Sequence, residues 1–404
     1  MNIIPKPSVR NNRDPSTSGT GKIAHPTDNN TMPHSSPTPR LRMALIGCGQ
    51  IADAHLQEAA KVSSVEVVAV CDMHLDLARQ AAARFQVPGI YDNVDRMLAE
   101  IKPDVVHITT PAHTHGPLTL KVLAAGCHVY VEKPFTLDAP EAEAVIAAAE
   151  IHDRKLCVGH DQLFDPTWLD CRRRIAAGQI GTVRHIESTL GYPISGQFGA
   201  VVAGDPRHWV RQLPGGLFQN TISHPLYRIL DLLPDSHPRV EARWDRSQYE
   251  FPTELWVQLR GAEVTGSLTF TNSVYAQRVT RVYGDQGMLE VDFDAQTIRR
   301  HTAPKLPGAF GRLEMPFRQW REGARNLRRN LWRFLKSEIH YFSGMRNLMA
   351  AFYLSIQQNT TQPITNAEML RVTRIMDEIF ADCRSREECM AEPVESTRML
   401  EAVR

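Results

Sequence analysis

The sequence predicts an α/β fold with two domains: a doubly wound parallel sheet, followed by an α+β domain with a large, mostly antiparallel open sheet. Three observations support this prediction. Short apolar runs alternate with helical segments from residue 41 to about residue 160, which is typical of a parallel sheet. The later runs show period-two alternation instead, which indicates antiparallel strands. A chain of 404 residues is also too long for one ordinary core.

The composition is that of a soluble globular protein, with a net charge of +1 at pH 7. This balance argues against a global polyanion-binding surface, and the sequence contains no recognised nucleic-acid-binding module, so we expect no nucleic-acid partner. The cysteines form no C-x-x-C pair, which indicates buried thiols in a reducing compartment. Residues 1–40 are rich in Ser, Thr, Pro and Asn and do not resemble a signal peptide. We therefore interpret them as a disordered tail of a cytoplasmic protein.

A glycine-containing turn follows the first apolar run, in "MALIGCGQIADAHL". Gly47 permits a tight turn, Gly49 lets the backbone approach a pyrophosphate, and Ala52 lets the helix pack closely on the strand. The helix N-terminus at Gln50 and Ile51 supplies N–H groups and a positive dipole. This order predicts a dinucleotide site, whereas the alternative is an ordinary glycine-rich turn.

The second apolar run, "VEVVAVCD", ends at Asp72. This acid lies about 20 residues past the glycines, where a carboxylate can bind the adenosine ribose hydroxyls. We therefore expect NAD as the cofactor and regard NADP as less favoured. In the alternative interpretation, Asp72 is only the N-cap of the helix "LDLARQAAARF".

Two later strands end on polar residues, in "DVVHITTP" and "CHVYVEKP". Ligands of a parallel sheet lie beyond the carboxyl ends of its strands. Thr110 and Pro111 are therefore expected at the nicotinamide end of the cofactor, together with Glu132, Lys133 and Pro134. The alternative for Glu132 and Lys133 is a hydrated ion pair at the end of a strand.

Four segments together resemble the Gfo/Idh/MocA family of oxidoreductases, over about Leu41 to Cys383. They are "GCGQIADAH", "TTPAHTHGPLTLKVLAAGCHVYVEKPFT", "FDPTWLDCRRRIAAGQIGTVRHIES" and "GGLFQNTISHPLYRILDLL". With this resemblance, the expected organisation is a Rossmann dinucleotide-binding domain at 41–160 and a substrate and oligomerisation domain at 161–365. A C-terminal helix and tail at 366–404 should return to the first domain.

The resemblance also implies roles for single residues. Lys133 is expected beside the nicotinamide and the substrate hydroxyl, with a cis peptide bond before Pro134. His115 matches a position of the family pattern and is expected near the cofactor. His224 ends the second active-site motif, "GGLFQNTISH", and is expected to exchange the proton of the substrate alcohol, because the usual pKa of an imidazole, about 6.5, lies near the working pH. The alternative is that His224 only caps a helix.

Three positions depart from the family pattern. Asn220 replaces an aspartate, Ala112 replaces a common asparagine, and His160 with Asp161 replaces a different pair near the substrate. An amide can position a sugar hydroxyl but cannot accept a proton. The expected substrate-binding residues are therefore His160, Asp161, Asn220 and His224, with Lys133 and His224 catalytic and no metal.

These features predict an NAD-dependent dehydrogenase that transfers hydride between the nicotinamide and a ring hydroxyl or ketone of a sugar or sugar nucleotide, in a setting such as polysaccharide biosynthesis. The alternative is a cofactor-binding, catalytically weak regulatory or scaffold protein, which Asn220 and Ala112 would suit.

The second half contains period-two runs that we expect to be consecutive strands without intervening helices. In the family that this chain resembles, the open face of such a sheet packs on another subunit, so a homodimer or homotetramer is expected. The expected strands are "TVRHIESTL", "RVEARWD", "ELWVQLR", "EVTGSLTFT", "QRVTRVYG" and "GMLEVDF".

A basic segment at about 307–346 lies outside the family's core pattern. Its spacing suggests a basic amphipathic helix, which through residues 318–336 contacts an anionic membrane surface or a protein partner. The alternative is a helix packed at a dimer interface with a solvated basic face. The arginines, lysine and apolar residues concerned are Arg318, Trp320, Arg321, Arg325, Leu327, Arg328, Arg329, Leu331, Trp332, Arg333, Phe334, Leu335 and Lys336.

Overall fold

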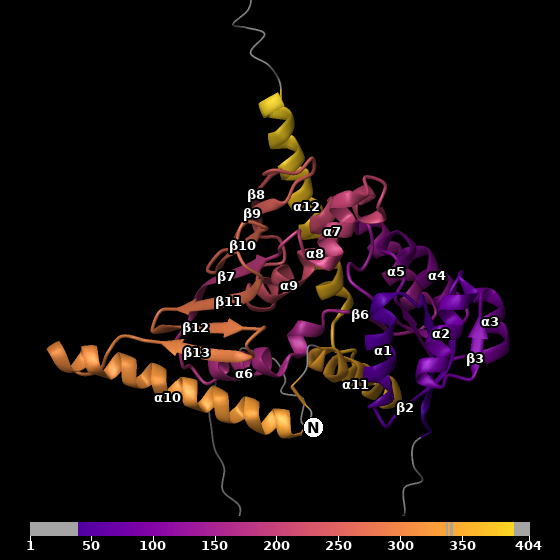
Figure 1. Ribbon diagram of the computed structural model, residues 1–404, viewed down its shortest axis with the longest axis horizontal. Coiled ribbons are helices and arrows are strands. Elements are labelled where there is room, and N and C mark those ends of the chain that lie inside the picture. The colour runs from indigo at the N-terminus through magenta and orange to yellow at the C-terminus, as the bar shows by residue number, and fades with distance from the viewer. Residues whose placement is uncertain (1–38, 337, 340–341, 392–404) are drawn as a thin grey trace, which may run out of the picture. The chain divides into compact units, whose positions relative to one another are not determined.

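The computed structural model describes residues 39–336, 338–339 and 342–391 (Figure 1). The described residues from Arg40 onward belong to one compact unit. The predicted tail at 1–40 lies, except for its last two residues, outside the described residues. The predicted domain boundary at residue 160 stays a prediction, because the chain on both sides of it belongs to that same unit.

The first sheet has six parallel strands in the order β3-β2-β1-β4-β5-β6, which confirms the predicted doubly wound sheet. The order reverses between β1 and β4, and in such sheets a ligand binds beside that reversal, beyond the carboxyl ends of the strands. The sequence pattern did not predict β3, because only one of its three residues is buried and it therefore lacks the continuous apolar run of the other strands. The strands are β1 (Leu41–Ile46), β2 (Val65–Cys71), β3 (Gly89–Tyr91), β4 (Val105–Ile108), β5 (His128–Val131) and β6 (Leu156–Val158).

Helices accompany this sheet, and its strands are buried almost throughout, which explains their continuous apolar runs. Helix α11 (Ser343–Gln357) joins the same core through residues such as Leu348 and Phe352, although it follows the second sheet in sequence. The other elements are α1 (Gln50–Ala60), α2 (Leu75–Phe85), α3 (Val94–Ile101), η1 (Ala112–Thr114), α4 (His115–Ala124), α5 (Ala139–Ile151) and η2 (Asp161–Phe164).

The second sheet has seven strands in the order β13-β12-β11-β7-β10-β9-β8. Every neighbouring pair is antiparallel except β7 with β10, so the predicted mostly antiparallel sheet is confirmed. The strands are β7 (Val183–Gly191), β8 (Arg239–Asp245), β9 (Glu254–Arg260), β10 (Thr265–Thr271), β11 (Gln277–Gly284), β12 (Gly287–Asp292) and β13 (Thr297–His301).

The expectation of consecutive strands without helices was wrong for the first two of these strands. Helices α7 (Gln197–Gly204), α8 (Gly216–Thr221) and α9 (Ser223–Leu232), with the turn η3 (Trp209–Gln212), lie between β7 and β8. The chain needs a long crossover there, because β7 pairs in parallel with β10. Helix α9 then packs on the sheet so closely that a Cβ added at Gly266 would lie 2.4 Å from Ile229 Cγ2.

Three further helices connect or border the sheets. Helix α12 (Asn366–Ala391) contacts both β8 of the second sheet and α5 of the first, where Ala139 N–H donates to Asp377 Oδ2 at 2.7 Å. Helix α6 (Pro166–Ala176) and the 28-residue helix α10 (Gly308–Leu335), drawn in orange, contact β13 at the edge of the second sheet (Figure 1). Among the described residues, no helix is both long and apolar enough to cross a lipid bilayer.

Candidate active site

The glycine turn after β1 has the features that a dinucleotide requires. Gly47 adopts φ +95°, and a Cβ there would lie 2.7 Å from Thr110 Cγ2, so both conformation and space require glycine. A Cβ at Gly49 would meet nothing within 4 Å, so open space lies beside this residue, the N-cap of α1. Ala52, in the first turn of α1, is fully buried. A phosphate therefore has room beside the N–H groups at Gln50 and Ile51.

The Asp72 carboxylate is fixed beside this turn. It accepts hydrogen bonds from Cys48 N–H at 2.7 Å and from His74 N–H at 2.8 Å. The N-cap of α2 is His74, so the alternative that Asp72 caps this helix is wrong. The open glycine turn, the helix N-terminus and this carboxylate fit the pyrophosphate and adenosine ribose of NAD.

The next two strand ends are tied together by His115. This buried ring contacts Pro134 O through Nδ1 at 2.7 Å and Thr110 O through Nε2 at 2.9 Å. His115 thus holds the turn at Thr110 and Pro111 against the turn that follows Lys133. The Lys133–Pro134 peptide bond is cis, as predicted.

Glu132 points into the protein rather than toward water. It is 7% exposed, and it accepts hydrogen bonds from His55 Nε2 at 2.9 Å and from Lys133 N–H at 3.2 Å. The alternative of a hydrated ion pair is therefore wrong for Glu132. Burial alone raises the pKa of a carboxyl, but the hydrogen bond from His55 and the charge of Lys133 outweigh it and hold the pKa of Glu132 below its usual value.

A buried polar chain continues behind Glu132. His55 Nδ1 contacts His107 Nδ1 at 2.9 Å, and His107 Nε2 contacts the Tyr353 hydroxyl of α11 at 2.8 Å. Our sequence analysis missed these three residues. The available signal was His107, a polar residue in the otherwise apolar strand β4.

The second active-site motif reaches Lys133 through α8. Lys133 Nζ donates to the backbone oxygen of Asn220 at 3.1 Å. The motif's glycines make this approach possible, because a Cβ at Gly215 would lie 2.3 Å from the Phe380 ring of α12 and Gly216 has φ +53°. The two predicted sites, although distant in sequence, therefore meet at Asn220.

Three side chains form a hydrogen-bonded trio that joins α9 to η2. His224 Nδ1 lies 2.7 Å from the Tyr227 hydroxyl, which lies 3.2 Å from Asp161 Oδ1. The His160 ring packs on Tyr227 with 4.6 Å between ring centroids. Our sequence analysis missed Tyr227, although its spacing of three from His224 places both on one helix face.

Electrostatics give the members of the trio different proton affinities. Burial and the negative charge of Glu132 raise the pKa of Asp161 to about 7. Burial and the positive charge of Lys133 hold the pKa of His224 well below its usual value. Burial also lowers the pKa of His160 to about 4. At neutral pH both imidazoles are therefore uncharged, whereas Asp161 is close to its midpoint.

The hydrogen-bond directions follow from these charges. Gln162 N–H donates to the Tyr227 oxygen at 3.2 Å, and an ionised Asp161 accepts from the Tyr227 O–H. His224 Nδ1 then carries a hydrogen and donates to Tyr227, which leaves Nε2 as the basic nitrogen. Among the described residues, no cluster of His, Cys, Asp and Glu side chains is arranged to hold a metal ion.

Comparison with known families agrees with this arrangement. Residues 41–160 match the profile described as "Oxidoreductase family, NAD-binding Rossmann fold", and residues 168–290 match the GFO/IDH/MocA C-terminal domain. The chain belongs to the GFO/IDH/MocA oxidoreductase family. The first sheet is thus the family's NAD-binding Rossmann domain, and NAD is its cofactor, as predicted.

Curated relatives match part of the chain. A D-glucoside 3-dehydrogenase of Escherichia coli (strain K12) is 33% identical over 144 residues, which are 35% of this chain and 41% of the relative. A UDP-N-acetylglucosamine 3-dehydrogenase of Acidithiobacillus ferrooxidans is 35% identical over 126 residues, 31% of this chain and 39% of the relative. The chain thus spans about two fifths of the length of these relatives.

Solved structures share the fold over most of the chain. The WlbA dehydrogenase from Bordetella pertussis, in complex with NADH and UDP-GlcNAcA, superposes with a TM-score of 0.69 at 19% identity and covers 86% of this chain and 96% of that one. At this identity the likeness concerns the fold. It includes both sheets, because the coverage extends over most of the described residues.

Proposed function

We propose that this protein is an NAD-dependent dehydrogenase that oxidises a ring hydroxyl of a sugar or sugar nucleotide, or reduces the corresponding ketone. The observation that carries the proposal is the contact of Lys133 Nζ with Asn220 O of α8 at 3.1 Å, together with the neighbouring Asp161–Tyr227–His224 trio, in which burial and the charge of Lys133 lower the pKa of His224. A cation and a neutral base in one place are what removal of a proton from an alcohol requires.

The residues for cofactor binding support the first half of the proposal. The N–H groups at the start of α1 would hold the pyrophosphate, and Asp72 would bind the adenosine ribose. NAD, when bound, supplies the hydride acceptor for the alcohol carbon. Thr110, Pro111, Glu132 and Pro134 form the strand ends expected at the nicotinamide, and Lys133 extends from there toward α8.

The trio supports the acid-base half. The positive charge of Lys133 favours the alkoxide form of a neighbouring alcohol, and His224 Nε2 accepts its proton. The Nδ1 proton of His224 then passes to the Tyr227 oxygen while the Tyr227 hydroxyl proton passes to Asp161, so His224 is left neutral with its hydrogen on Nε2 and Tyr227 keeps a hydroxyl group. A proton that leaves the alcohol can thus be held at Asp161, whose pKa of about 7 suits both its uptake and its release.

Asn220 does not leave the site without a carboxylate. Its backbone oxygen accepts from Lys133, and Asp161 supplies the ionisable oxygen that the amide cannot. This arrangement favours an active enzyme over the weakly catalytic scaffold. Ala112, the other departure from the family pattern, is buried at the start of η1.

The proposed substrate class rests on relatives. Their printed names include a glucoside 3-dehydrogenase and a UDP-N-acetylglucosamine 3-dehydrogenase, and a structural neighbour holds UDP-GlcNAcA. His160, Asp161, Asn220 and His224 are the residues we propose to bind the substrate. All four lie on or next to η2, α8 and α9.

A turnover assay tests the proposal. Purified protein should reduce NAD to NADH with at least one member of a panel of free sugars, inositols and UDP-sugars. The absorbance of NADH measures this reaction. The scaffold alternative would be favoured if the protein bound NAD but reduced no NAD with any sugar of the panel. In that case NADH and the corresponding keto-sugars should also give no reaction.

We also propose a homodimer or homotetramer formed through the uncovered face of the second sheet. The side chains on that face pair across the strands: Arg281 contacts both Glu187 and Glu290 at 2.9 Å, and His185 contacts Thr265 at 2.8 Å. The resulting surface is ordered before association, which lowers the entropy cost of an interface. Sedimentation equilibrium should give a multiple of the chain mass, and a monomer at micromolar concentration would contradict the proposal.

A further inference from the structure

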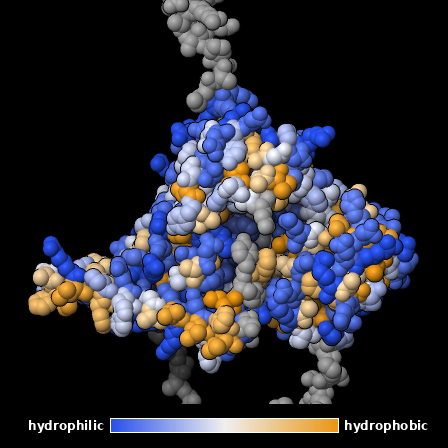
Figure 2. Space-filling view, in the orientation of Figure 1, coloured by the Kyte–Doolittle hydropathy of each residue, from blue (hydrophilic) through white to orange (hydrophobic). Residues whose placement is uncertain are grey.

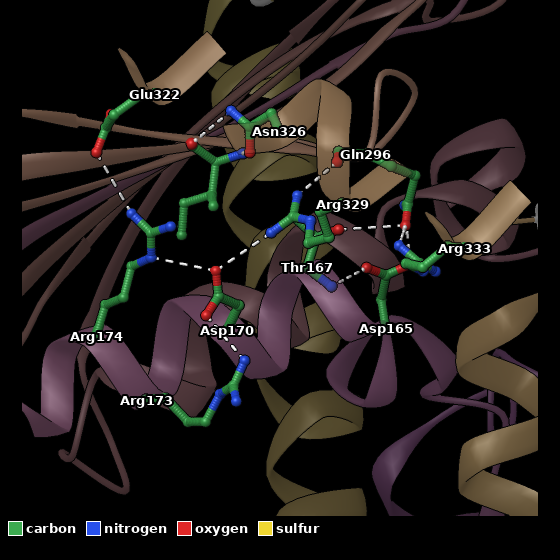
Figure 3. Close-up of polar contacts among 11 residues, drawn as sticks. Asp165, Thr167, Asp170, Arg173, Arg174, Gln296, Glu322, Asn326, Arg329 and Arg333 are labelled. Atoms are coloured by element: carbon green, nitrogen blue, oxygen red, sulfur yellow. Dashed lines mark hydrogen bonds and ion pairs between the residues drawn. The ribbon is translucent and has the colours of Figure 1, made fainter. Parts of the chain in front are cut away.

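Helix α10 is held to the protein by one polar face. The buried residues of this helix, Gly311, Asn326 and Arg333, all lie on that face. Asn326 donates to Ile298 O at 2.9 Å and accepts from Ile298 N–H at 3.3 Å, so its amide continues the hydrogen bonding of the edge strand β13 (Figure 3). The helix therefore covers a strand edge that would otherwise be exposed.

Ion pairs and further hydrogen bonds fix the same face. Asp170 of α6 accepts from Arg329 at 3.2 Å and from Arg174 at 3.1 Å, and Arg174 also pairs with Glu322 at 3.5 Å (Figure 3). Arg333 donates to Gln296 Oε1 at 3.0 Å. Of the basic residues that the sequence pattern grouped on one face, Arg329 and Arg333 are thus turned inward, because they donate to Asp170 of α6 and to Gln296 in the turn between β12 and β13.

The opposite face of α10 is an apolar stripe without a covering element among the described residues. Its members recur every three or four residues, apart from one step of seven between Trp320 and Leu327, and each is between 53% and 71% exposed. In Figure 2, orange and tan residues gather toward both ends of the strip that α10 occupies in Figure 1. The stripe consists of Phe310, Leu313, Phe317, Trp320, Leu327, Leu331 and Phe334, with Trp332 and Leu335 beside it.

The charges beside the stripe have one sign. Arg321, Arg325 and Arg328 are exposed along one side of it. The two acidic residues of the helix lie on the protein side, where Glu314 pairs with Arg318 and Glu322 with Arg174. An exposed apolar face with exposed arginines along one side, and no exposed acidic residue of the helix beside it, is complementary to a surface that is apolar beneath and negatively charged above.

We propose that α10 lies flat on an anionic lipid surface, with the apolar stripe in the interface and the flanking arginines at the headgroups. A second copy of the helix is a poorer partner, because its arginines would face these arginines without an acidic residue between them. The 28-residue helix is about 42 Å long, so its contact extends over many lipids. Aromatic residues such as Trp320 suit the headgroup level. The proposal is independent of the dehydrogenase activity.

Vesicle co-sedimentation with the full chain tests the proposal. The protein should bind vesicles of equal parts phosphatidylserine and phosphatidylcholine at low salt, and should not bind phosphatidylcholine vesicles. Binding should fall as salt is added, because salt screens the arginines. Absence of binding to the anionic vesicles at low salt, or equal binding to both kinds, would overturn the proposal.

Two matched sets of variants separate charge from apolar contact. The triple variant R321E/R325E/R328E should lose about a hundredfold in affinity for anionic vesicles. The control R79E/R96E/R239E makes the same change in net charge at exposed arginines elsewhere and should bind as the parent does. If the control lost as much affinity for anionic vesicles, the net charge of the protein would explain the effect and the proposal would be contradicted.

The apolar triple variant L313S/L327S/L331S should also lose vesicle binding, because it removes the stripe and leaves the arginines. The control L77S/L120S/I151S removes exposed aliphatic residues elsewhere and should retain it. If the stripe variant instead converted a dimer into a monomer in sedimentation equilibrium and the parent bound no vesicles, a second copy would be the partner and the lipid proposal would be wrong.

Discussion

The cofactor side and the substrate side of the candidate active site are built from different kinds of groups. The cofactor side uses mainly backbone: the Gly47 turn, the space at Gly49 and the N-terminus of α1. The substrate side uses side chains, among them Lys133, Asp161 and His224, from three separate segments. Backbone sites keep a recognisable glycine pattern, whereas side-chain sites can change their members and keep their chemistry.

This difference explains how Asn220 is tolerated. The backbone oxygen of Asn220, at the position that carries an aspartate in the family pattern, contacts Lys133, and we propose that Asp161 of η2 supplies the carboxylate. If the comparison is right, changes on the substrate side should lower turnover and leave NAD binding intact. Changes on the cofactor side should alter coenzyme choice and leave the acid-base chemistry intact.

The largest effect is expected for Lys133→Met. The variant removes the charge beside the reacting alcohol, so kcat should fall by about a hundredfold or more, the scale for a lost acid-base group. The dissociation constant of NAD, measured by fluorescence titration, should change little. The control Lys121→Met removes an exposed lysine that pairs with Asp95 away from the site, and its kcat should equal that of the parent.

A smaller effect is expected for Tyr227→Phe. This variant keeps the ring that packs on His160 but removes the hydroxyl that joins His224 to Asp161. A hydrogen bond to a charged group contributes about 2 kcal/mol, so kcat should fall by about thirtyfold. Steady-state kinetics would decide this, and an unchanged kcat with an unchanged pH profile would remove Tyr227 from the mechanism.

The smallest effect is expected on the cofactor side, for Asp72→Ser. The carboxylate should repel the additional phosphate of NADP, and its loss at a partly exposed site should narrow the preference for NAD by about fivefold. Binding titrations with both coenzymes measure the ratio. Equal affinities in the unaltered protein would contradict the assignment of Asp72.

The cofactor side could be predicted from the sequence because its parts are contiguous. The turn and the helix start lie between β1 and β2, Asp72 directly follows β2, and each has a local sequence pattern. The six predicted strands of the second sheet match β7 to β12 for a similar reason, since alternation is local. The short strand β3 and the crossover between β7 and β8 lacked such a signal.

The substrate side could be predicted only in part. Lys133 and His224 were identified from motifs, but the contact of Tyr227 with Asp161 joins residues that are 66 positions apart, and no local pattern encodes it. The interpretation of Glu132 as part of a hydrated ion pair was wrong, because its partner His55 lies 77 positions earlier in the sequence. The direction in which a charged side chain points depends on such distant partners.

The pH dependence of sugar oxidation, compared between the parent and Asp161→Asn, tests the central claim most directly. Burial and the charge of Glu132 raise the pKa of Asp161 to about 7, so this carboxyl is protonated below that pH and ionised above it. The ionised form is the proton acceptor, and His224 does not titrate near neutrality because its pKa lies well below its usual value. The parent's kcat/KM for oxidation should therefore rise as the pH passes through about 7, and Asp161→Asn should be slower and show no such rise. A variant that kept the same rise with normal turnover would contradict the proposed role of the Asp161–Tyr227–His224 trio.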